Sequence, residues 1–338
     1  MLELFENHPF LKKFEDSAVL NKKISVQGLK GSSVALALAY FFKKHKGKHL
    51  FVTAYEEKAM YLFDDLKQLA GSEENIYFMP HSGETIAILN QTDHHQTNLR
   101  LNALQNISQN ENFICVTYAR GLIEKVPNKQ MWQTNKFTIH QGEKIDLDFL
   151  IEFLVELKLE REDYAIEPGQ FSIRGNIIDI YSPGMEFPCR IVLDDEKVEK
   201  IKLFDPDTLS SIKEIKHVDI FPDVLHNDSI AQLTNIFEFS GPDTVVWWED
   251  KSWVNQFMRN YLEEGRLDAS IHLLPDEFEK LTGTLKEIFL HPYEKTKEKV
   301  IELEAKTESQ PLFHKNFKIL ADSLNNFRQK KLPALFSE

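Results

Sequence analysis

The chain has 338 residues, of which 42% are hydrophobic and 28% are charged, a composition typical of soluble globular proteins. Its 40 basic and 53 acidic residues give a net charge of −13, which disfavours general binding to DNA or RNA because such binding relies on clustered cations. The two cysteines, Cys115 and Cys189, are too few for a disulfide framework or a thiolate metal site, which favours a reducing cytosol.

The N-terminal residues predict no targeting or membrane segment. Glu3 and Glu6 stand where a secretory signal requires basic residues. The longest apolar runs, such as Val34–Phe42, are far shorter than the roughly 18 to 20 residues of a membrane span. We therefore expect a soluble cytoplasmic protein without a membrane partner, and the length allows two or three domains.

From Lys23 to about Val126, short β-type runs alternate with amphipathic helical stretches, a pattern typical of a parallel α/β sheet with helices on both faces. The periodicity predicts strands at Lys23–Gln27, His49–Thr53, Ile76–Met79 and Phe113–Thr117, and helices at Val34–Lys44, Glu56–Ala70 and Asp93–Asn106.

The turn after the first strand occupies the position of a phosphate-binding loop. A working loop reads G-x-x-x-x-G-K-[ST], with the lysine on the phosphates and the hydroxyl on Mg²⁺. Counting from Gly28, those places hold Ser33, Val34 and Ala35, although Gly28, Gly31 and the helix N-terminus could still attract an anion. We expect a structural turn rather than a site for phosphoryl transfer.

After Pro127 the pattern changes to a small α+β unit. A periodic helix at Asp146–Leu159 precedes a β-rich meander whose short turns indicate antiparallel pairing. The expected edges of this unit are near residues 135 and 223. Its predicted strands are Phe171–Tyr181, Cys189–Leu193, Lys197–Phe204 and Lys213–Phe221.

The remaining residues could complete the first sheet. Thr244–Trp248 is a further parallel-strand candidate, followed by the acidic pair Glu249 and Asp250, which we interpret as an ordinary loop rather than a Mg²⁺ site. His81, His94 and His95 lack the spacing of a zinc site, so no metal ligand is predicted. Helices are predicted at Trp253–Glu264 and Asp276–Phe289, followed by a charged stretch, Glu294–Lys306, and by a further element at Phe317–Arg328 that suggests a fragment.

Two arginines in the meander form the sharpest signal. Phe171 and Ile173 alternate with polar residues, and Gly175 breaks the alternation as a bulge would, so Arg174 is predicted to point outward. In the next strand Arg190 points outward as well, and arginines on a rigid sheet are typical of interaction hot spots. The alternative, equally weighted on the pattern alone, is that they pair with neighbours such as Glu186 or Asp194.

At these residues the chain resembles a known family. The motifs are similar to the UvrA-binding domain shared by UvrB and the bacterial transcription-repair coupling factors (Mfd), and the flanking blocks resemble a degenerate RecA-like (P-loop-type) domain interrupted by it. UvrB fits less well, because it keeps an intact phosphate loop and a long DNA-clamping hairpin for which residues 80–100 leave too little room. The motifs are Gly169-Gln170-Phe171, Arg174-Gly175, Asp179-Ile180-Tyr181, Pro183-Gly184, Pro188-x-Arg190, Asp194-Asp195-Glu196 and Leu203-Phe204-Asp205-Pro206-Asp207.

The resemblance implies a non-catalytic module that recruits UvrA in transcription-coupled nucleotide excision repair. The resemblance also implies that the whole protein is an ATP-driven translocase that displaces stalled RNA polymerase. Its other domains would bind ATP, Mg²⁺, DNA and polymerase, and they could mask the UvrA site. No cofactor is expected in this chain. The implied domains are 1–134 and 224–310 for the RecA-like part, 135–223 for the insertion and 311–338 for the start of a following element. The implied UvrA-contacting residues are Arg174 and Arg190, with Arg161, Phe171, Gly175 and Leu193 beside them.

Two alternatives remain. The chain could be a nucleotide-dependent binder of damaged DNA that resembles UvrB, or it could bind DNA without a nucleotide. ATP titration separates the first from an interaction module, and a steep salt dependence would indicate the second.

Overall fold

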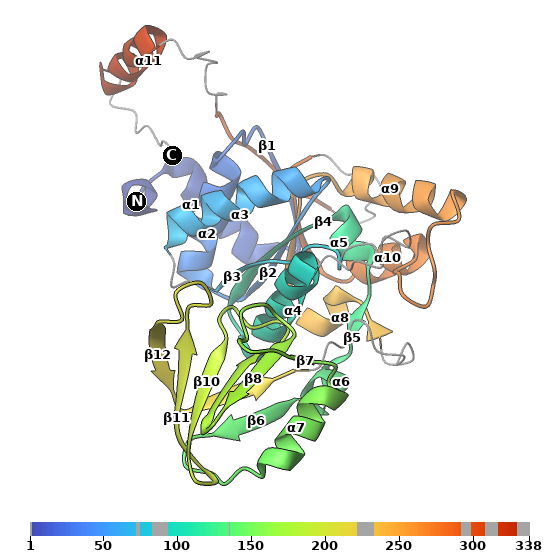
Figure 1. Cartoon of the computed structure of the whole chain (residues 1–338). Coiled ribbons are helices and arrows are strands. Elements are labelled where there is room, and N and C mark those ends of the chain that lie inside the picture. Colours follow the sequence, from blue (N-terminus) through green and yellow to red (C-terminus); the bar gives the residue numbers. More distant parts are fainter. Residues whose placement is uncertain are drawn as a thin grey trace.

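A computed structural model describes residues 2–71, 75–82, 94–134, 136–221, 233–291, 299–307 and 317–329. Its larger part is built on a parallel sheet whose strands come from both ends of the chain (Figure 1). The strands are β1 (Lys23–Gln27), β2 (Lys48–Thr53), β3 (Ile76–Phe78), β4 (Phe113–Tyr118), β15 (Val245–Trp248), β16 (Lys286–Phe289) and β17 (Ile301–Glu304). They lie in the order β17-β1-β16-β15-β2-β4-β3, and all six pairings are parallel.

Helices cover both faces of this sheet. One face packs against the first three helices and the other against the later ones, and each contact buries an apolar cluster. The first group is α1 (Pro9–Leu20), α2 (Ser33–His45) and α3 (Glu56–Ala70). The second is α4 (His94–Gln109), α5 (Ala119–Ile123), α8 (Ile236–Ser240), α9 (Lys251–Glu263) and α10 (Pro275–Thr282).

Two consecutive tryptophans show how the central strand connects these layers. Since side chains alternate along a strand, Trp247 enters the cluster under α1–α3 and Trp248 enters the opposite one. Each buried indole N–H has an acceptor: Trp247 donates to His49 Nδ1 at 3.1 Å, and Trp248 donates to Glu287 Oε1 at 2.9 Å. Burial therefore leaves neither donor unsatisfied.

The inserted part is a six-stranded sheet with one helix on its inner face (Figure 1). The helix is α7 (Leu147–Glu156), and all strand pairs but the last are antiparallel. In spatial order the strands are β12 (Ser211–Ile215), β11 (Lys197–Phe204), β10 (Cys189–Asp194), β9 (Ile177–Tyr181), β8 (Gln170–Arg174) and β7 (Glu160–Arg161).

Short elements connect the two parts or lie outside the sheets. Two antiparallel strand pairs, β5 with β14 and β6 with β13, bring the two ends of the insertion side by side. The elements are η1 (Leu2–Phe5), β5 (Val126–Pro127), α6 (Lys129–Thr134), β6 (Phe137–His140), β13 (His217–Ile220), β14 (Leu233–Thr234) and α11 (Phe317–Gln329).

The predicted fold class is confirmed, but one predicted helix is wrong in its second half. Residues 276–282 belong to α10, whereas residues 286–289 form strand β16, which lies between β1 and β15. Thr282 and Gly283 end the helix, and the short mixed segment that follows, Lys286-Glu287-Ile288-Phe289, forms a buried parallel strand although two of its four residues are charged. The charged stretch contains β17, an edge strand that the sequence did not predict.

Two predicted strands in the insertion are each two strands. Phe171–Tyr181 is the hairpin of β8 and β9, and Gly175 with Asn176 forms its two-residue turn rather than a bulge. Gly175 has a φ of 63°, which glycine accepts without steric cost, and a Gly-Asn pair is itself a hairpin signal. Lys213–Phe221 divides into β12 and β13, which belong to different sheets. Asp93 and the expected boundaries at 135 and 223 lie outside the described residues.

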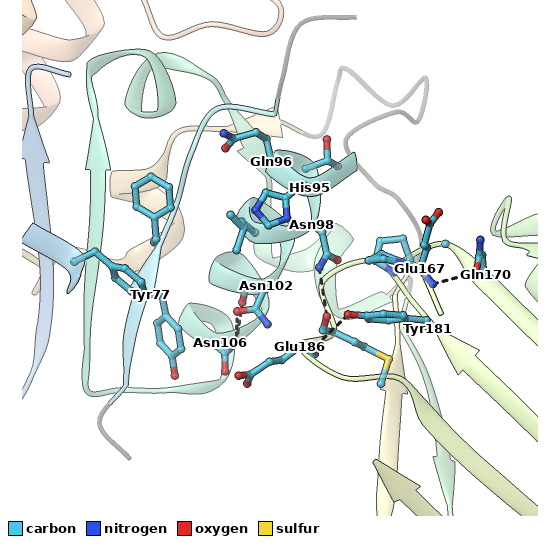
Figure 2. A pocket seen from close by; sticks show the side chains of 18 of the residues that line it. Tyr77, His95, Gln96, Asn98, Asn102, Asn106, Glu167, Gln170, Tyr181 and Glu186 are labelled. Carbon is cyan, nitrogen blue, oxygen red and sulfur yellow. Dashed lines mark hydrogen bonds between the residues drawn. The ribbon is translucent and has the colours of Figure 1, made fainter. Parts of the chain in front are cut away.

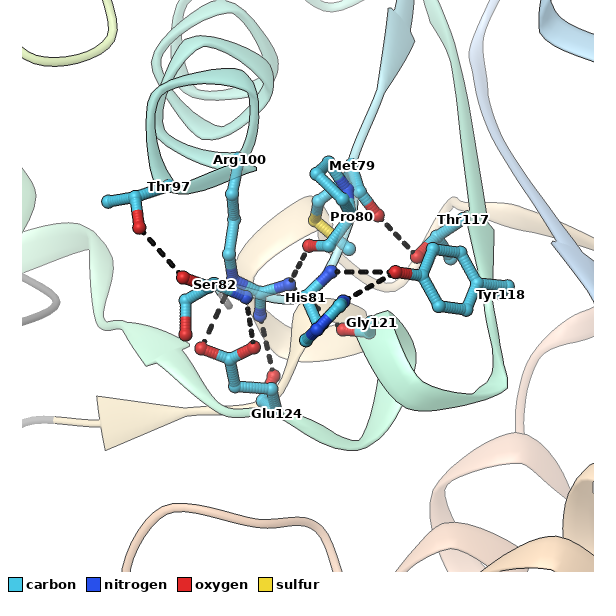
Figure 3. Close-up of polar contacts among 10 residues, drawn as sticks. All are labelled: Met79, Pro80, His81, Ser82, Thr97, Arg100, Thr117, Tyr118, Gly121 and Glu124. Atoms are coloured by element: carbon cyan, nitrogen blue, oxygen red, sulfur yellow. Dashed lines mark hydrogen bonds and ion pairs between the residues drawn. The ribbon is translucent and has the colours of Figure 1, made fainter. Parts of the chain in front are cut away.

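A buried arginine fixes the chain just beyond β3 (Figure 3). Arg100 is fully buried, and it donates to the carbonyl oxygens of Pro80, Gly121 and Glu124 at 2.7–2.9 Å. His81 contacts the Tyr118 hydroxyl at 2.5 Å, and burial lowers the pKa of His81. Three guanidinium donors go to backbone carbonyls, and Nε lies 3.7 Å from Glu124 Oε1. This cluster therefore serves to anchor residues 79–82 against α4 and α5.

Candidate interaction site

Two arginines and one aspartate form a bound set on the outer face of the six-stranded sheet. Asp179, on β9, is only 1% exposed, while Arg174 and Arg190 on the flanking strands are 33% and 20% exposed. Arg190 donates Nε to Asp179 Oδ1 at 2.7 Å and Nη2 to Oδ2 at 2.9 Å. Arg174 donates Nη2 to Oδ2 at 2.6 Å. A single buried carboxylate thus orients both guanidinium groups.

Further contacts hold each arginine in place. Arg174 stacks on the Tyr164 ring at 4.5 Å and donates Nη1 to the Asp163 carbonyl oxygen at 2.6 Å. Arg190 stacks on the Phe204 ring at 4.6 Å. The hydrogen bonds to Asp179 raise the pKa of Arg190, so its charge is secure at every physiological pH. Both side chains are preorganised, which reduces the conformational entropy lost when a partner binds.

The surrounding face adds positive charge to a chain that is acidic overall. Arg190 lies directly opposite Lys202 in the antiparallel pair of β10 and β11, so both side chains leave the same face. Lys200 follows on that face two residues away, and Glu214 lies opposite Lys202. We name the set Ser172, Arg174, Asp179, Arg190, Lys200 and Lys202 the arginine face.

The structure brings only two of the predicted contact side chains together on this face. Gly175 is exposed in the hairpin turn beside Arg174. Phe171 and Leu193 are buried in the core of the insertion, because alternation along the strand turns them inward, so in this structure they support the face from beneath. Arg161 is exposed on β7 in register with Phe171, which places it on the other side of the sheet from Arg174.

Sequence reasoning missed the aspartate that organises the site. Neither of the proposed acids, Glu186 and Asp194, pairs with the arginines. Arg174 and Arg190 both pair with Asp179. The signal that could have found it is strand alternation. In the observed hairpin register Ser172 lies opposite Asp179, so both side chains leave the same face as Arg174. An acidic residue in the outward row of a central strand, between two arginines, is the pattern that identifies such a set.

Side chains and backbone of the chain itself contact the turn at the phosphate-loop position. Ser33 Oγ accepts from Lys30 N at 2.8 Å, so this loop amide is directed at a side chain. A Cβ on Gly28 would lie 2.1 Å from the Ala305 carbonyl oxygen, and the Gly28 carbonyl accepts from Thr307 Oγ1 at 2.6 Å. Gly31 has a φ of 54°, Val34 packs against the core and Ala35 is buried. The segment after β17 therefore lies against the loop at the point where a phosphate loop must stay open.

The acidic residues after β15 have structural partners. Glu249 contacts Lys58 at 2.5 Å and accepts from Ala54 N at 3.0 Å. Asp250 caps α9 by accepting from Trp253 N at 2.9 Å. Within the described ranges, no group of three or more His, Cys, Asp or Glu residues could hold a metal ion. In the same ranges, no helix has the length and apolar character to cross a membrane.

A groove of about 1220 Å³ is lined by residues of α3, β3 and α4 on one side and of the inserted part on the other. Figure 2 shows the α4 asparagines and the residues of the insertion that line it. At one side of it, α4 holds the turn between β9 and β10. Asn98 Oδ1 accepts from Gly184 N at 2.6 Å, and Asn102 Nδ2 donates to Gly184 O at 2.8 Å. These bonds, which we call the asparagine clamp, fix how the arginine face is presented relative to the larger sheet.

Comparison with known proteins agrees with this architecture. Residues 137–226 match the family model described as the UvrB interaction domain. The transcription-repair-coupling factor of Bacillus subtilis (strain 168) is 28% identical over 222 residues, which are 63% of this chain and 19% of that protein. That of Staphylococcus aureus (strain MSSA476) is 30% identical over 195 residues, which are 58% of this chain and 16% of that protein. The chain thus spans about a fifth or less of the length of these relatives.

Proposed function

The chain contains a UvrB interaction domain and is similar to transcription-repair-coupling factors, and from this premise we propose that it is a protein-interaction module that binds UvrA. The arginine face is the surface that makes the contact. The observation that carries the proposal is the buried Asp179, which holds Arg174 and Arg190 side by side on an exposed sheet.

The chemistry of this face selects an acidic partner surface. Asp179 neutralises one of the two arginine charges, so the set retains a net positive charge, and Lys202 lies beside it. A guanidinium has five N–H donors, of which Arg190 uses two on Asp179. Its remaining donors are free to bind a partner carboxylate without breaking the internal pairs.

The proposed role is recruitment. By analogy with transcription-repair-coupling factors, UvrA would be brought to a site where transcription has stopped, and packing of other domains over the arginine face would mask it until then. The same analogy assigns ATP, Mg²⁺, DNA and RNA polymerase to other domains of a longer protein in the cytoplasm. We propose that this chain itself performs no catalysis and carries no cofactor.

Titration of purified UvrA with single variants tests the site. We expect Arg174→Ala and Arg190→Ala each to weaken binding by about 30-fold, since central arginine contacts contribute about 2 kcal/mol. Asp179→Asn should weaken binding although both arginines remain, because their orientation is lost. Arg266→Ala, a half-exposed arginine on the larger part, is the matched control. Unchanged affinity in the Arg174→Ala/Arg190→Ala double variant would remove the site assignment.

The competing function is nucleotide-dependent DNA binding. The contacts of Ser33 and of the segment after β17 with the phosphate-loop position support the view that ATP has no place to bind. Calorimetric titration with ATP and Mg²⁺ should therefore give no saturable heat. Micromolar binding that is lost in a Gly31→Val variant would instead favour the UvrB-like function.

A further inference from the structure

Helix α7 is more apolar than its place on the molecule requires. Seven of its ten residues are apolar, yet only one side packs on the sheet, through Leu150 and Leu154. Phe149 and Val155 are 55% and 57% exposed. A helix that is apolar on several sides is normally buried on several sides. The solvent-facing side of α7 is therefore more apolar than is usual for an exposed helix.

Three phenylalanines on one flank of α7 form a cluster, of which Phe149 is exposed and Phe137 and Phe153 are half-buried. Phe137, on β6, lies 4.8 Å from Phe153 and 6.2 Å from Phe149, measured between ring centroids. Phe149 and Phe153 stack on each other at 6.3 Å. A contiguous aromatic patch of this kind is typical of an interaction surface, whereas isolated apolar residues on a surface carry no such meaning.

Acidic residues run along the outer side of the same helix. Asp148, Glu152 and Glu156 are exposed and follow each other at intervals of four, which aligns them in one row. Like charges at this spacing destabilise a helix. Within the described residues the three carboxylates have no ion pair, so their repulsion is unrelieved in the free protein. We name Phe137, Phe149, Phe153 and Val155 with these three carboxylates the α7 surface.

We propose that the α7 surface is a second docking surface, and that its occupant is a basic amphipathic helix of a partner protein. Aliphatic side chains of that helix would cover the phenylalanines, and its lysines or arginines would pair with the carboxylate row. A second copy of this chain would bring the same three acids and be repelled, as would the phosphates of an anionic membrane. Charge complementarity therefore selects a cationic protein segment.

This surface is independent of the arginine face. Leu150 and Leu154 pack against the inner side of the sheet, while Arg174, Asp179 and Arg190 leave its outer side. The hydrophobic core of the insertion separates the two, so both surfaces can be occupied at once. The inference does not depend on the identity of the partner at the arginine face.

Three labelled peptides of about 18 residues, long enough to form a helix, test the proposal on the whole chain by fluorescence anisotropy. One has leucine and lysine at helical spacing, the second replaces leucine by serine, and the third replaces lysine by glutamate. Only the first is expected to bind. Equal binding of the serine peptide would show that binding requires only positive charge attracted to an acidic protein, and it would overturn the proposal.

Variants locate the peptide. Phe149→Ala/Val155→Ala and, separately, Glu152→Lys are expected to weaken binding at least about tenfold, as loss of central contacts does. Ile212→Ala, which shortens a half-exposed apolar side chain on β12 of the same domain, should leave it unchanged. Amide shifts of the unmodified chain on peptide addition should concentrate at residues 147–156, which keeps the test valid should a variant unfold. Shifts elsewhere, equal binding by the double variant, or self-association of the chain through α7 would each overturn the proposal.

Discussion

Two titratable side chains buried in the larger sheet, Glu287 and His49, have specific partners, which restrict the protonation states that they can adopt. Glu287 is fully buried and contacts Lys251, Lys23 at 3.2 Å and the Trp248 indole. His49 is buried between strands, accepts from Trp247 at Nδ1 and donates from Nε2 to the Lys46 carbonyl at 2.9 Å. Since one ring nitrogen accepts, the imidazole must be neutral in the folded state.

The neutral His49 predicts a loss of stability in mild acid. Burial lowers its pKa from 6.5 to about 4, so between these values the unfolded chain binds a proton that the folded chain does not. The contribution of neutral His49 to the free energy of unfolding is fully present above pH 6.5 and is lost as pH falls toward 4. We expect the free energy of unfolding to fall by about 2 kcal/mol between pH 7 and pH 5. Urea midpoints followed by tryptophan fluorescence measure it.

His49→Gln provides the control, because glutamine keeps an acceptor for Trp247 but does not titrate in this range. His81 and His272 also have lowered pKa values through burial, and they titrate in both proteins. The difference between wild type and variant therefore isolates His49. Identical pH dependence in the two proteins would contradict the prediction.

At the scale of elements, the turn after β1 and the strand β17 depend on each other. Ala305 N donates to the Gln27 carbonyl at 2.7 Å, directly before the close approach of Ala305 to Gly28. Gly28 and Gly31 both have positive φ, but a Cβ on Gly31 would meet no atom within 4 Å. A side chain at Gly31 would therefore meet only the strain of a positive φ, whereas a side chain at Gly28 would meet that strain and a steric clash with Ala305.

We expect Gly28→Ala to destabilise the larger sheet by about 3 kcal/mol and Gly31→Ala by about 1 kcal/mol. The second value is the usual strain of a non-glycine residue at positive φ, and the first adds the displacement of β17 from β1. Chemical denaturation of both variants measures the difference. Equal destabilisation would show that the contact between the loop and Ala305 contributes nothing.

At the scale of the whole molecule, the asparagine clamp couples the two sheets. All four tryptophans, at 132, 247, 248 and 253, lie in the larger part, so tryptophan fluorescence reports on that part alone. Far-UV circular dichroism reports on both parts. In the unmodified chain we expect the two signals to change together during unfolding, because the Gly184 turn is bound to α4.

Removal of the clamp should separate the two transitions. In Asn98→Ala/Asn102→Ala we expect the circular dichroism to begin changing at lower urea than the fluorescence, as the insertion unfolds first. Asn110→Ala is the control, because its side chain donates to the Asn106 carbonyl and the Tyr77 hydroxyl, both in the larger part. Coincident transitions in the double variant would mean that other contacts provide the coupling.

The amino-acid sequence by itself determined the two kinds of sheet and the outward position of Arg174 and Arg190, because strand alternation and turn residues are local signals. It also showed the altered phosphate loop, since Ser33, Val34 and Ala35 are read directly. The structure showed that β16 is a strand, that the segment after β17 lies against Gly28 and that Asp179 holds both arginines. The first two depend on contacts between segments far apart in the chain, and periodicity within one segment carries no information about which segment will lie beside it. The third is local, and it depended on the register of the hairpin, which the sequence-based prediction placed wrongly.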